Sequence, residues 1–291
     1  MCTLHHKGCI DVVGVRNMRF INIFVIIICI LLFLSGFILE KGAGLYWNVN
    51  SLIFVLTGTI GAAFLSYSSS RIKFAIIVLI NAYFRKLPTE SSIVMALLDF
   101  SLKSRYEGLL SMEDTIDRAE TPFLKDAMMM LVDGRTSEEI KDFMNIEMTF
   151  FRQRREHNER VFRAMAITAP AFGLIGSVIG LMGMLTGIGD VGVIIRTIPI
   201  ALTSTLYGIL FNNFLFTPIA EKIHSRTQEE LLLQKLIMSG TIAISNAQNP
   251  YVLEKKLSSF LALSVRTQIE REFKDIRKQY MKVQWKDKEQ A

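Results

Sequence analysis

Cysteine is scarce in this chain of 291 residues, which has three: Cys2, Cys9 and Cys29. Their number is odd and one lies inside an apolar run, so the sequence does not predict a disulfide framework. His5 and His6 lie between the first two cysteines, but the spacing fits no standard zinc site, and we expect no metal. Neither a nucleophile–base constellation nor a nucleotide-binding loop is visible, so the sequence predicts no enzyme and implies no cofactor.

Charged residues are missing from four long stretches of the chain. Hydrophobic residues make up 51% of the sequence and the mean hydropathy is +0.34, too apolar for an ordinary soluble domain. The uncharged stretches are residues 20–39, 51–67, 164–188 and 197–220, and about 20 helical residues cross a hydrocarbon core of ~30 Å. The first stretch is too long for the core of a signal peptide and is not followed by a clean cleavage site. The sequence therefore predicts an all-α membrane protein with four transmembrane helices.

Basic residues flank the four predicted spans unevenly. They precede the first and third spans and follow the second and fourth: Lys7, Arg16, Arg19, Arg71, Lys73, Arg85, Lys86, Arg160, Arg163, Lys222 and Arg226. The short connections, 40–50 and 189–196, carry only Lys41 and Arg196. Because basic loops stay on the cytoplasmic side, we expect both termini and the large loop to be cytoplasmic. The net charge of +6 reflects these flanks, and no basic tract interleaved with aromatic residues suggests nucleic-acid binding.

The predicted organisation has five parts. A cytoplasmic tail (1–19) precedes spans 1 and 2 (20–67), a large helical loop (68–163) precedes spans 3 and 4 (164–220), and a helical cytoplasmic region (221–291) follows. For the tail we expect either disorder or a stretch upstream of a true start at Met18.

Local signals divide the loop into helices. The run 74–84 is too short to cross a membrane, so we expect an interfacial or packed helix there, interrupted at Pro88. Thr121-Pro122 marks a helix start and Gly134 a helix stop.

A capping box and a long unbroken stretch follow. Thr136 and Glu139 have the spacing of a capping box, and no helix breaker follows before Pro170. One long helix is therefore predicted to run from the loop into the third span. Past the fourth span, charged and apolar positions alternate, with a helix break predicted at Asn249-Pro250.

Small residues form a seam along the third span. They recur at spacings of three and four, on one helix face, at Ala166, Ala169, Gly173, Gly176, Gly180, Gly183 and Gly187. The fourth span carries a similar seam at Ala201, Thr205, Gly208 and Asn212. Small residues let helix backbones approach closely in lipid. The seam therefore predicts either close packing of span 3 on span 4 or a smooth face turned toward a partner helix. We take the partner-facing interpretation as the prediction.

No Asp, Glu, Lys or His lies inside any of the four spans. Hydroxyl and amide groups are present instead, at Ser177, Thr203, Ser204, Thr205, Asn212 and Asn213. Ion pathways in membranes commonly use a titratable group near the midplane. If this chain conducts ions, the carboxylate must come from another chain. The ordinary role of such hydroxyls is to bond a helix carbonyl one turn back.

Two prolines and two loop charges complete the candidate residues. Pro170 and Pro218 lie at the predicted cytoplasmic ends of spans 3 and 4, as hinge-forming kinks or as simple boundaries. Arg105 and Glu113 lie eight residues apart, on nearly the same helix face but too far apart for an i,i+4 pair. Their ordinary interpretation is solvated surface charge.

These stretches resemble the MotA/PomA flagellar stator subunits of the MotA/TolQ/ExbB superfamily. The resemblance runs from about residue 20 to 262 and is carried by "LTGTIGAAFLSY", "SRYEGLLSME", "TPFLKDAMMMLVDG", "APAFGLIGSVIGLMGML" and "TSTLYGILFNNFLFTPIAEKI". It implies an inner-membrane homopentamer around two copies of a MotB-like single-span partner, whose aspartate binds the permeating ion and whose periplasmic domain anchors to peptidoglycan. Ion flow would turn the pentamer against the rotor protein FliG. Arg105 and Glu113 match the rotor-interacting charges, and Pro170 and Pro218 the span-end prolines.

Two departures from the family pattern bear on the expectations. Pro199 interrupts the lead into span 4, where we expect it in the first helical turn. At position 177 sodium-type relatives have Thr and proton-type relatives often Ala, so Ser177, with Ser204 and Thr205, leads us to expect sodium over protons. The alternatives are an ExbB/TolQ-like energy transducer, which typically lacks a fourth span, and a non-conducting membrane scaffold.

Overall fold

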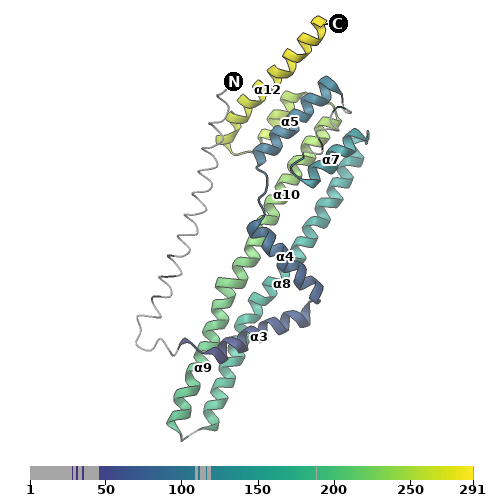
Figure 1. Cartoon of the computed structure of the whole chain (residues 1–291). Coiled ribbons are helices and arrows are strands. Elements are labelled where there is room, and N and C mark those ends of the chain that lie inside the picture. The colour runs from purple at the N-terminus through teal and green to yellow at the C-terminus, as the bar shows by residue number, and fades with distance from the viewer. Residues whose placement is uncertain are drawn as a thin grey trace. The chain divides into compact units, whose positions relative to one another are not determined.

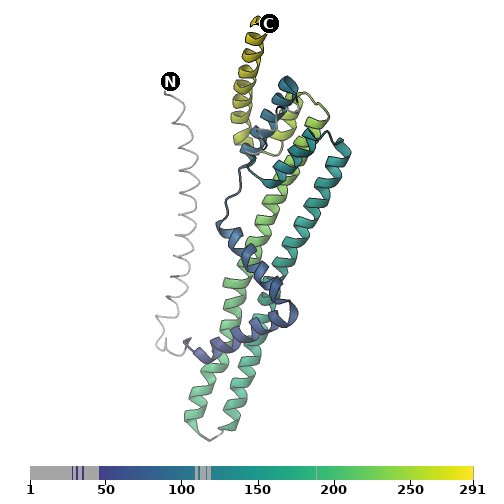
Figure 2. The same cartoon turned by 45° about the vertical axis from the view of Figure 1, so that its right-hand side comes forward.

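The computed structural model describes residues 46–108, 119–187 and 189–290, together with Ile28, Leu31, Ser35, Ser111 and Ile116. The tail 1–19 and most of the first predicted span lie outside the described residues. Helices account for the described ranges, joined by short turns (Figures 1 and 2). The chain forms two compact units, with 46–62 and 166–213 in one and 63–108, 119–165 and 214–290 in the other. We call them the apolar unit and the charged unit.

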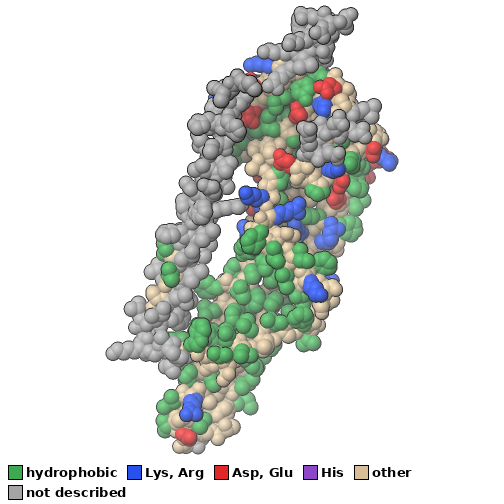
Figure 3. Space-filling view, in the orientation of Figure 1, with side chains coloured by type: hydrophobic (Ala, Val, Ile, Leu, Met, Phe, Trp, Pro, Cys, Tyr) green, Lys and Arg blue, Asp and Glu red, His purple; other side chains and the backbone are tan. Residues whose placement is uncertain are grey.

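The apolar unit contains α3 (Val49–Ser66), the C-terminal part of α8 (Ser137–Thr186) and α9 (Val191–Leu210). Among the described residues, three helical stretches are long and apolar enough to cross a membrane: α3, the end of α8, and the continuous run that starts with α9. They coincide with the second, third and fourth predicted spans. Apolar side chains dominate the surface of this unit on the face that Figure 3 shows.

The start of α9 corrects the position expected for Pro199. Asp190 caps the helix, its Oδ1 accepting a hydrogen bond from the Gly192 N–H at 2.8 Å, so α9 begins at Val191. Pro199 therefore lies in the helix interior and not in its first turn. A proline there removes one backbone donor from the helix ladder, which is a real cost to α9.

The charged unit contains the remaining helices of the described chain. They are α4 (Ser69–Phe84), α5 (Glu90–Glu107), α7 (Pro122–Val132), the first part of α8, α10 (Thr217–Ser245), α11 (Pro250–Ser258) and α12 (Leu263–Gln290). Helix α10 packs on α4, α5 and α7, and α11 and α12 pack on α5. Their shared core is apolar and closed to solvent, with Leu97, Met128, Leu236 and Phe273 at 1% exposure or less. Burial of these apolar side chains away from water stabilises the helix bundle of the charged unit.

The predicted helix signals in this unit are confirmed. Thr121 Oγ1 accepts from the Leu124 N–H at 3.2 Å at the start of α7, and Gly134 ends that segment with a φ of +71°. The capping box forms in both directions: the Glu139 N–H donates to Thr136 Oγ1 (3.3 Å), and the Thr136 N–H donates to Glu139 Oε2 (3.0 Å). From there α8 runs unbroken for 50 residues. Asn249 caps α11 after the predicted break.

Helix α4 begins earlier than the run 74–84 predicts, because Ser68 caps it. Its surface leaves Phe74, Ile77, Ile80 and Phe84 exposed, with Phe84 at 82%. The helix also carries Arg71 and Lys73 in its first turns. A large exposed apolar face beside basic residues is typical of a helix at a membrane surface.

Candidate functional site

The glycine seam of α8 packs against α9 of the same chain. A Cβ added at Gly173 would lie 2.9 Å from the Ser204 carbonyl oxygen, and one at Gly180 would lie 2.9 Å from the Ala201 nitrogen. The same holds for Gly176, whose Cβ would meet the Ser204 side chain at 2.8 Å, and for Gly187, whose Cβ would overlap Val193. The contacts loosen only at Gly183, where Thr197 Cγ2 would be 3.6 Å away.

This geometry corrects the prediction that the seam of Gly173, Gly176, Gly180, Gly183 and Gly187 faces a partner chain. The face is already occupied by α9, so close packing within one chain accounts for it. The second seam meets the first: a Cβ at Gly208 would lie 2.7 Å from the Ala169 carbonyl oxygen. Sequence spacing identified which residues lie on one face but could not identify what covers that face.

The three hydroxyls predicted to line an ion pathway have different environments. Ser204 is 1% exposed, lies under Gly176, and donates to the Ile200 carbonyl oxygen at 2.8 Å. Its hydroxyl thus follows the ordinary pattern of bonding one turn back, inside the contact between α8 and α9. Ser177 and Thr205 are half-buried, and within the described chain neither hydroxyl forms a hydrogen bond. These two remain the hydroxyls that can be presented to an ion.

Helix α3 is fastened to α9 by polar groups that the sequence did not single out as a set. Tyr207 Oη accepts from the Asn48 N–H at 3.1 Å and donates to the Tyr46 carbonyl oxygen. Ser51, 1% exposed, donates from Oγ to the Ile200 carbonyl oxygen at 3.0 Å, and the Thr203 hydroxyl lies 3.0 Å from Ser51 Oγ. Buried polar groups in a membrane helix need such partners. Isolated Ser, Thr and Tyr residues give no sequence signal that would pair them.

The two span-end prolines occupy different local structures. Pro170 lies inside α8, and its Cα would be 3.0 Å from a Cβ at Gly208. Pro218 lies in the first turn of α10, directly after the π-helical turn Phe211–Phe216. A π turn changes the register of the backbone hydrogen bonds from i→i−4 to i→i−5. Pro218, which has no backbone N–H, therefore lies where the regular α-helical hydrogen bonds are already interrupted. Asn213 adds a side-chain donor to the Ile209 carbonyl oxygen at 3.0 Å.

The two predicted rotor charges can be placed only in part. Arg105 lies exposed in the last turn of α5. Glu113 lies outside the described residues. Arg105 borders a hollow in the charged unit that also touches α11 and α12.

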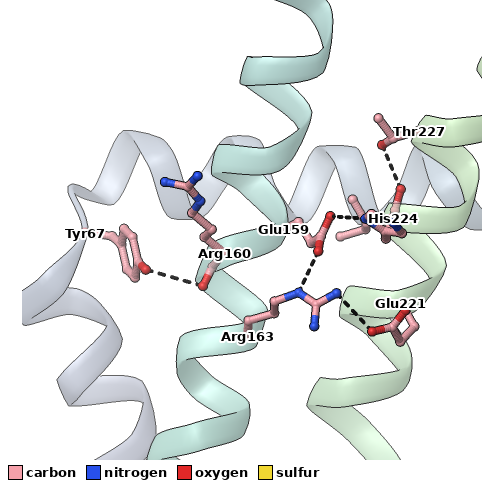
Figure 4. Close-up of polar contacts among 8 residues, drawn as sticks. Tyr67, Glu159, Arg160, Arg163, Glu221, His224 and Thr227 are labelled. Carbon is pink, nitrogen blue, oxygen red and sulfur yellow. Dashed lines mark hydrogen bonds and ion pairs between the residues drawn. The ribbon is translucent and has the colours of Figure 1, made fainter. Parts of the chain in front are cut away.

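A charged network joins α8 to α10 within the charged unit (Figure 4). The Glu159 carboxylate accepts from Arg163 Nε at 2.6 Å and lies 3.1 Å from His224 Nδ1, while Arg163 Nη2 donates to Glu221 at 2.9 Å. The bond to Glu159 raises the pKa of Arg163. In Figure 4 the Tyr67 hydroxyl also reaches the backbone oxygen of the same α8 segment, at Arg160. In the sequence Arg160 and Arg163 indicate only the topology of the third span, whereas the i,i+4 spacing of Glu159 and Arg163 is the signal that could have predicted their ion pair.

Comparisons with known proteins agree with this architecture. Residues 115–235 match the model of the MotA/TolQ/ExbB proton channel family, which is not a family of enzymes. Motility protein A of Borreliella burgdorferi is 32% identical over 78% of this chain and 88% of its own length.

Two solved structures also resemble the chain. The C. jejuni MotAB structure gives a TM-score of 0.76 at 29% identity, covering 83% of this chain and 95% of that chain. The flagellar MotAB stator complex from Bacillus subtilis gives 0.78 at 25% identity, covering 84% and 97%. With its apolar membrane helices and its similarity to both motility proteins and stator structures, the chain belongs to the MotA/TolQ/ExbB proton channel family as a MotA-type flagellar stator subunit.

Proposed function

We propose that this stator subunit assembles as a homopentamer around a MotB-like single-span partner and conducts ions inward to generate torque on the rotor protein FliG. The observation that carries the proposal is the absence of Asp, Glu, Lys and His from the spans of a chain similar to MotAB stators. An ion pathway along these helices needs a carboxylate from another chain. The basic residues that flank the spans favour cytoplasmic termini and a cytoplasmic loop, with the spans in the bacterial inner membrane.

The partner span meets the face of α8 that α9 leaves open. That face carries Leu174, Val178 and Leu181, each exposed by 47% or more, and Ser177 lies at its edge. An uncovered apolar face of a membrane helix contacts either lipid or another protein chain. Ser177 is then the chain's hydroxyl next to the partner's carboxylate, and Thr205 on α9 is the second. Hydroxyl oxygens are ligands that suit a hard cation such as sodium.

The ion assignment is tested by swimming speed against sodium concentration at fixed pH, with a protonophore as a control on proton flow. We expect speed to rise with sodium in the wild type. Ser177→Ala should weaken that dependence and Ser177→Thr should keep it. Thr186→Ala is the matched control, because the Thr186 hydroxyl on the same helix already donates to the Gly183 carbonyl oxygen at 2.8 Å. Speeds independent of sodium in the wild type, or unchanged by Ser177→Ala, would contradict the sodium assignment.

The rotor contact is tested by reversing the charge of Arg105 and Glu113 together. We expect impaired swimming with unchanged amounts of the chain in the membrane and unchanged co-purification of the MotB-like partner. Normal swimming in this double variant would show that the two charges are ordinary surface.

A further inference from the structure

Arg105 shares a hollow of about 250 Å³ with a second arginine from the C-terminal helix. The hollow is bordered by Arg105 and Tyr106 of α5, Pro250 and Tyr251 of α11, and Arg277 and Met281 of α12. Arg277 lies beyond residues 115–235, the segment that the family model matches. Two cationic side chains from helices far apart in sequence therefore face the same small volume.

Aromatic contacts fix Arg277 in this position. The guanidinium carbon of Arg277 lies 4.4 Å from the centroid of the Tyr251 ring, a cation–π contact. Helix α12 itself is held on α5 by Tyr280, which stacks on Tyr106 at 6.0 Å and donates to Asp99 Oδ1 at 3.0 Å. Phe273, one turn before Arg277, is 1% exposed and meets the Tyr251 ring edge to face. The Arg277 side chain is thus held in one position by its contact with Tyr251, whose ring packs on Phe273.

Two arginines and no carboxylate are among the described residues that border the hollow. In the described part of the chain neither the Arg105 nor the Arg277 guanidinium forms an ion pair with a carboxylate, and the nearby Asp99 carboxylate accepts from Tyr280. Two like charges at one small volume repel each other, and an anion between them attracts both, so that the net electrostatic interaction becomes favourable. Guanidinium forks match the two oxygens of a carboxylate, and pre-ordering lowers the entropy lost on binding.

The size of the hollow indicates which anion it holds. Pockets for nucleotides and other small molecules usually measure roughly 300–1,000 Å³, whereas one water occupies about 30 Å³. A volume of about 250 Å³ that is open to solvent fits a side chain better than a cofactor. We infer that Arg105 and Arg277 together receive an acidic side chain of the rotor protein, with Tyr251 as the residue that positions Arg277. This inference rests on the proposed rotor contact of Arg105.

The test is photocrosslinking in living cells that lack the chromosomal copy of this gene and carry it on a plasmid. Benzoylphenylalanine in place of Met281 puts the photoprobe on the wall of the hollow, and capture of FliG is measured together with swimming speed. We expect Arg277→Glu to lower the yield of the FliG adduct about tenfold and to slow swimming, as Arg105→Glu does, since loss of a charge-assisted contact weakens binding by about that factor. Arg277→Lys should give an intermediate yield, because lysine keeps the charge but not the fork.

Arg271→Glu is the matched control. It makes the same charge change at an exposed position of the same helix, so yield and speed should match those of the unmutated protein. Arg277→Gln is measured in parallel, because it removes the charge without introducing the opposite one. It should lower the yield of the FliG adduct while the amount of the chain in the membrane stays unchanged. This result would show that binding is lost and that α12 has not detached from the charged unit. If Arg105→Glu abolishes capture and Arg277→Glu does not, the shared hollow is refuted and the rotor contact stands. If FliG is not captured in any variant and Arg105→Glu swims normally, the proposed rotor contact itself fails.

Discussion

The contact that Gly208 of α9 makes with the backbone of α8 gives the sharpest test of the packing described above. Gly208 faces the backbone of α8: an added Cβ would lie 2.7 Å from the Ala169 carbonyl oxygen, 3.0 Å from Pro170 Cα and 3.1 Å from Gly173 Cα. All three are backbone atoms and cannot rotate away. Gly183 on α8 provides the control, because its added Cβ would meet only Thr197 Cγ2, at 3.6 Å.

The expected sizes follow from these distances. At Gly208 the nearest contact is about 0.7 Å short of ordinary van der Waals contact, so the two helices must separate for alanine to fit. Overpacking of this kind costs about 1–3 kcal/mol, and the better helix propensity of alanine offsets up to about 1 kcal/mol of it. With that full offset, Gly208→Ala should therefore be destabilising by up to about 2 kcal/mol. Gly183→Ala gains the propensity term without the clash and should be neutral or slightly stabilising.

The assay is the midpoint temperature of heat-induced aggregation of the detergent-solubilised complex, read by size-exclusion chromatography. Gly208→Ala should lower this temperature, Gly173→Ala should lower it less, and Gly183→Ala should leave it unchanged or raise it. The order follows the shortest backbone contacts, 2.7 Å and 2.9 Å, against 3.6 Å to a side chain. Equal losses for Gly208→Ala and Gly183→Ala would refute the assignment of the seam to the α8–α9 contact.

Three further changes in the charged unit have defined outcomes in the same aggregation assay. Thr136→Ala should cost about 1 kcal/mol because it removes the hydroxyl that accepts from the Glu139 N–H, and equal wild-type and variant midpoints at pH 7 would contradict this. The Thr136 N–H, which the variant keeps, lowers the pKa of Glu139 from its ordinary value of 4.5, so in both proteins the contribution of that bond is present above pH 4.5 and is lost as the pH falls through the folded-state pKa. Burial, together with the nearby Asp126 carboxylate, raises the pKa of Glu147, and Glu147 Oε2 is buried without a hydrogen-bond partner among the described residues. Glu147→Gln should therefore raise the midpoint temperature at pH 8, where the buried carboxylate is charged, and this gain should disappear in acid, where Glu147 is protonated. A lower midpoint at pH 8 would argue against this. Phe273→Ala should cost about 3–5 kcal/mol and expose α12 to limited proteolysis, whereas Leu263→Ala, at a 79% exposed position, should not.

Local chemistry accounts for the parts of the fold that could be predicted from the sequence. The cap at Thr121, the stop at Gly134 and the capping box of Thr136 and Glu139 each act through backbone groups within four residues, so their effect is readable from spacing. The long helix into the third span follows from the absence of helix breakers between Glu139 and Pro170, and α8 then continues through Pro170 to Thr186. The start of α9 was misplaced because the span was located by its apolar residues, while the helix begins at its cap, Asp190.

Tertiary contacts decided what those elements do to one another. A 3–4 spacing establishes that the glycines of α8 share a face, but the same spacing suits a helix of the same chain or of a partner, and only the approach of α9 separates them. The pairing of Arg105 with Arg277 is likewise invisible in sequence, since 172 positions separate them and α5, α11 and α12 must pack before one hollow exists. The sequence by itself determined the helix ends that a local cap or stop marks, at Thr121, Gly134 and Thr136, and that the spans carry no carboxylate. The packed structure determined which faces are closed and which remain open to a partner, because that depends on distances between residues far apart along the chain.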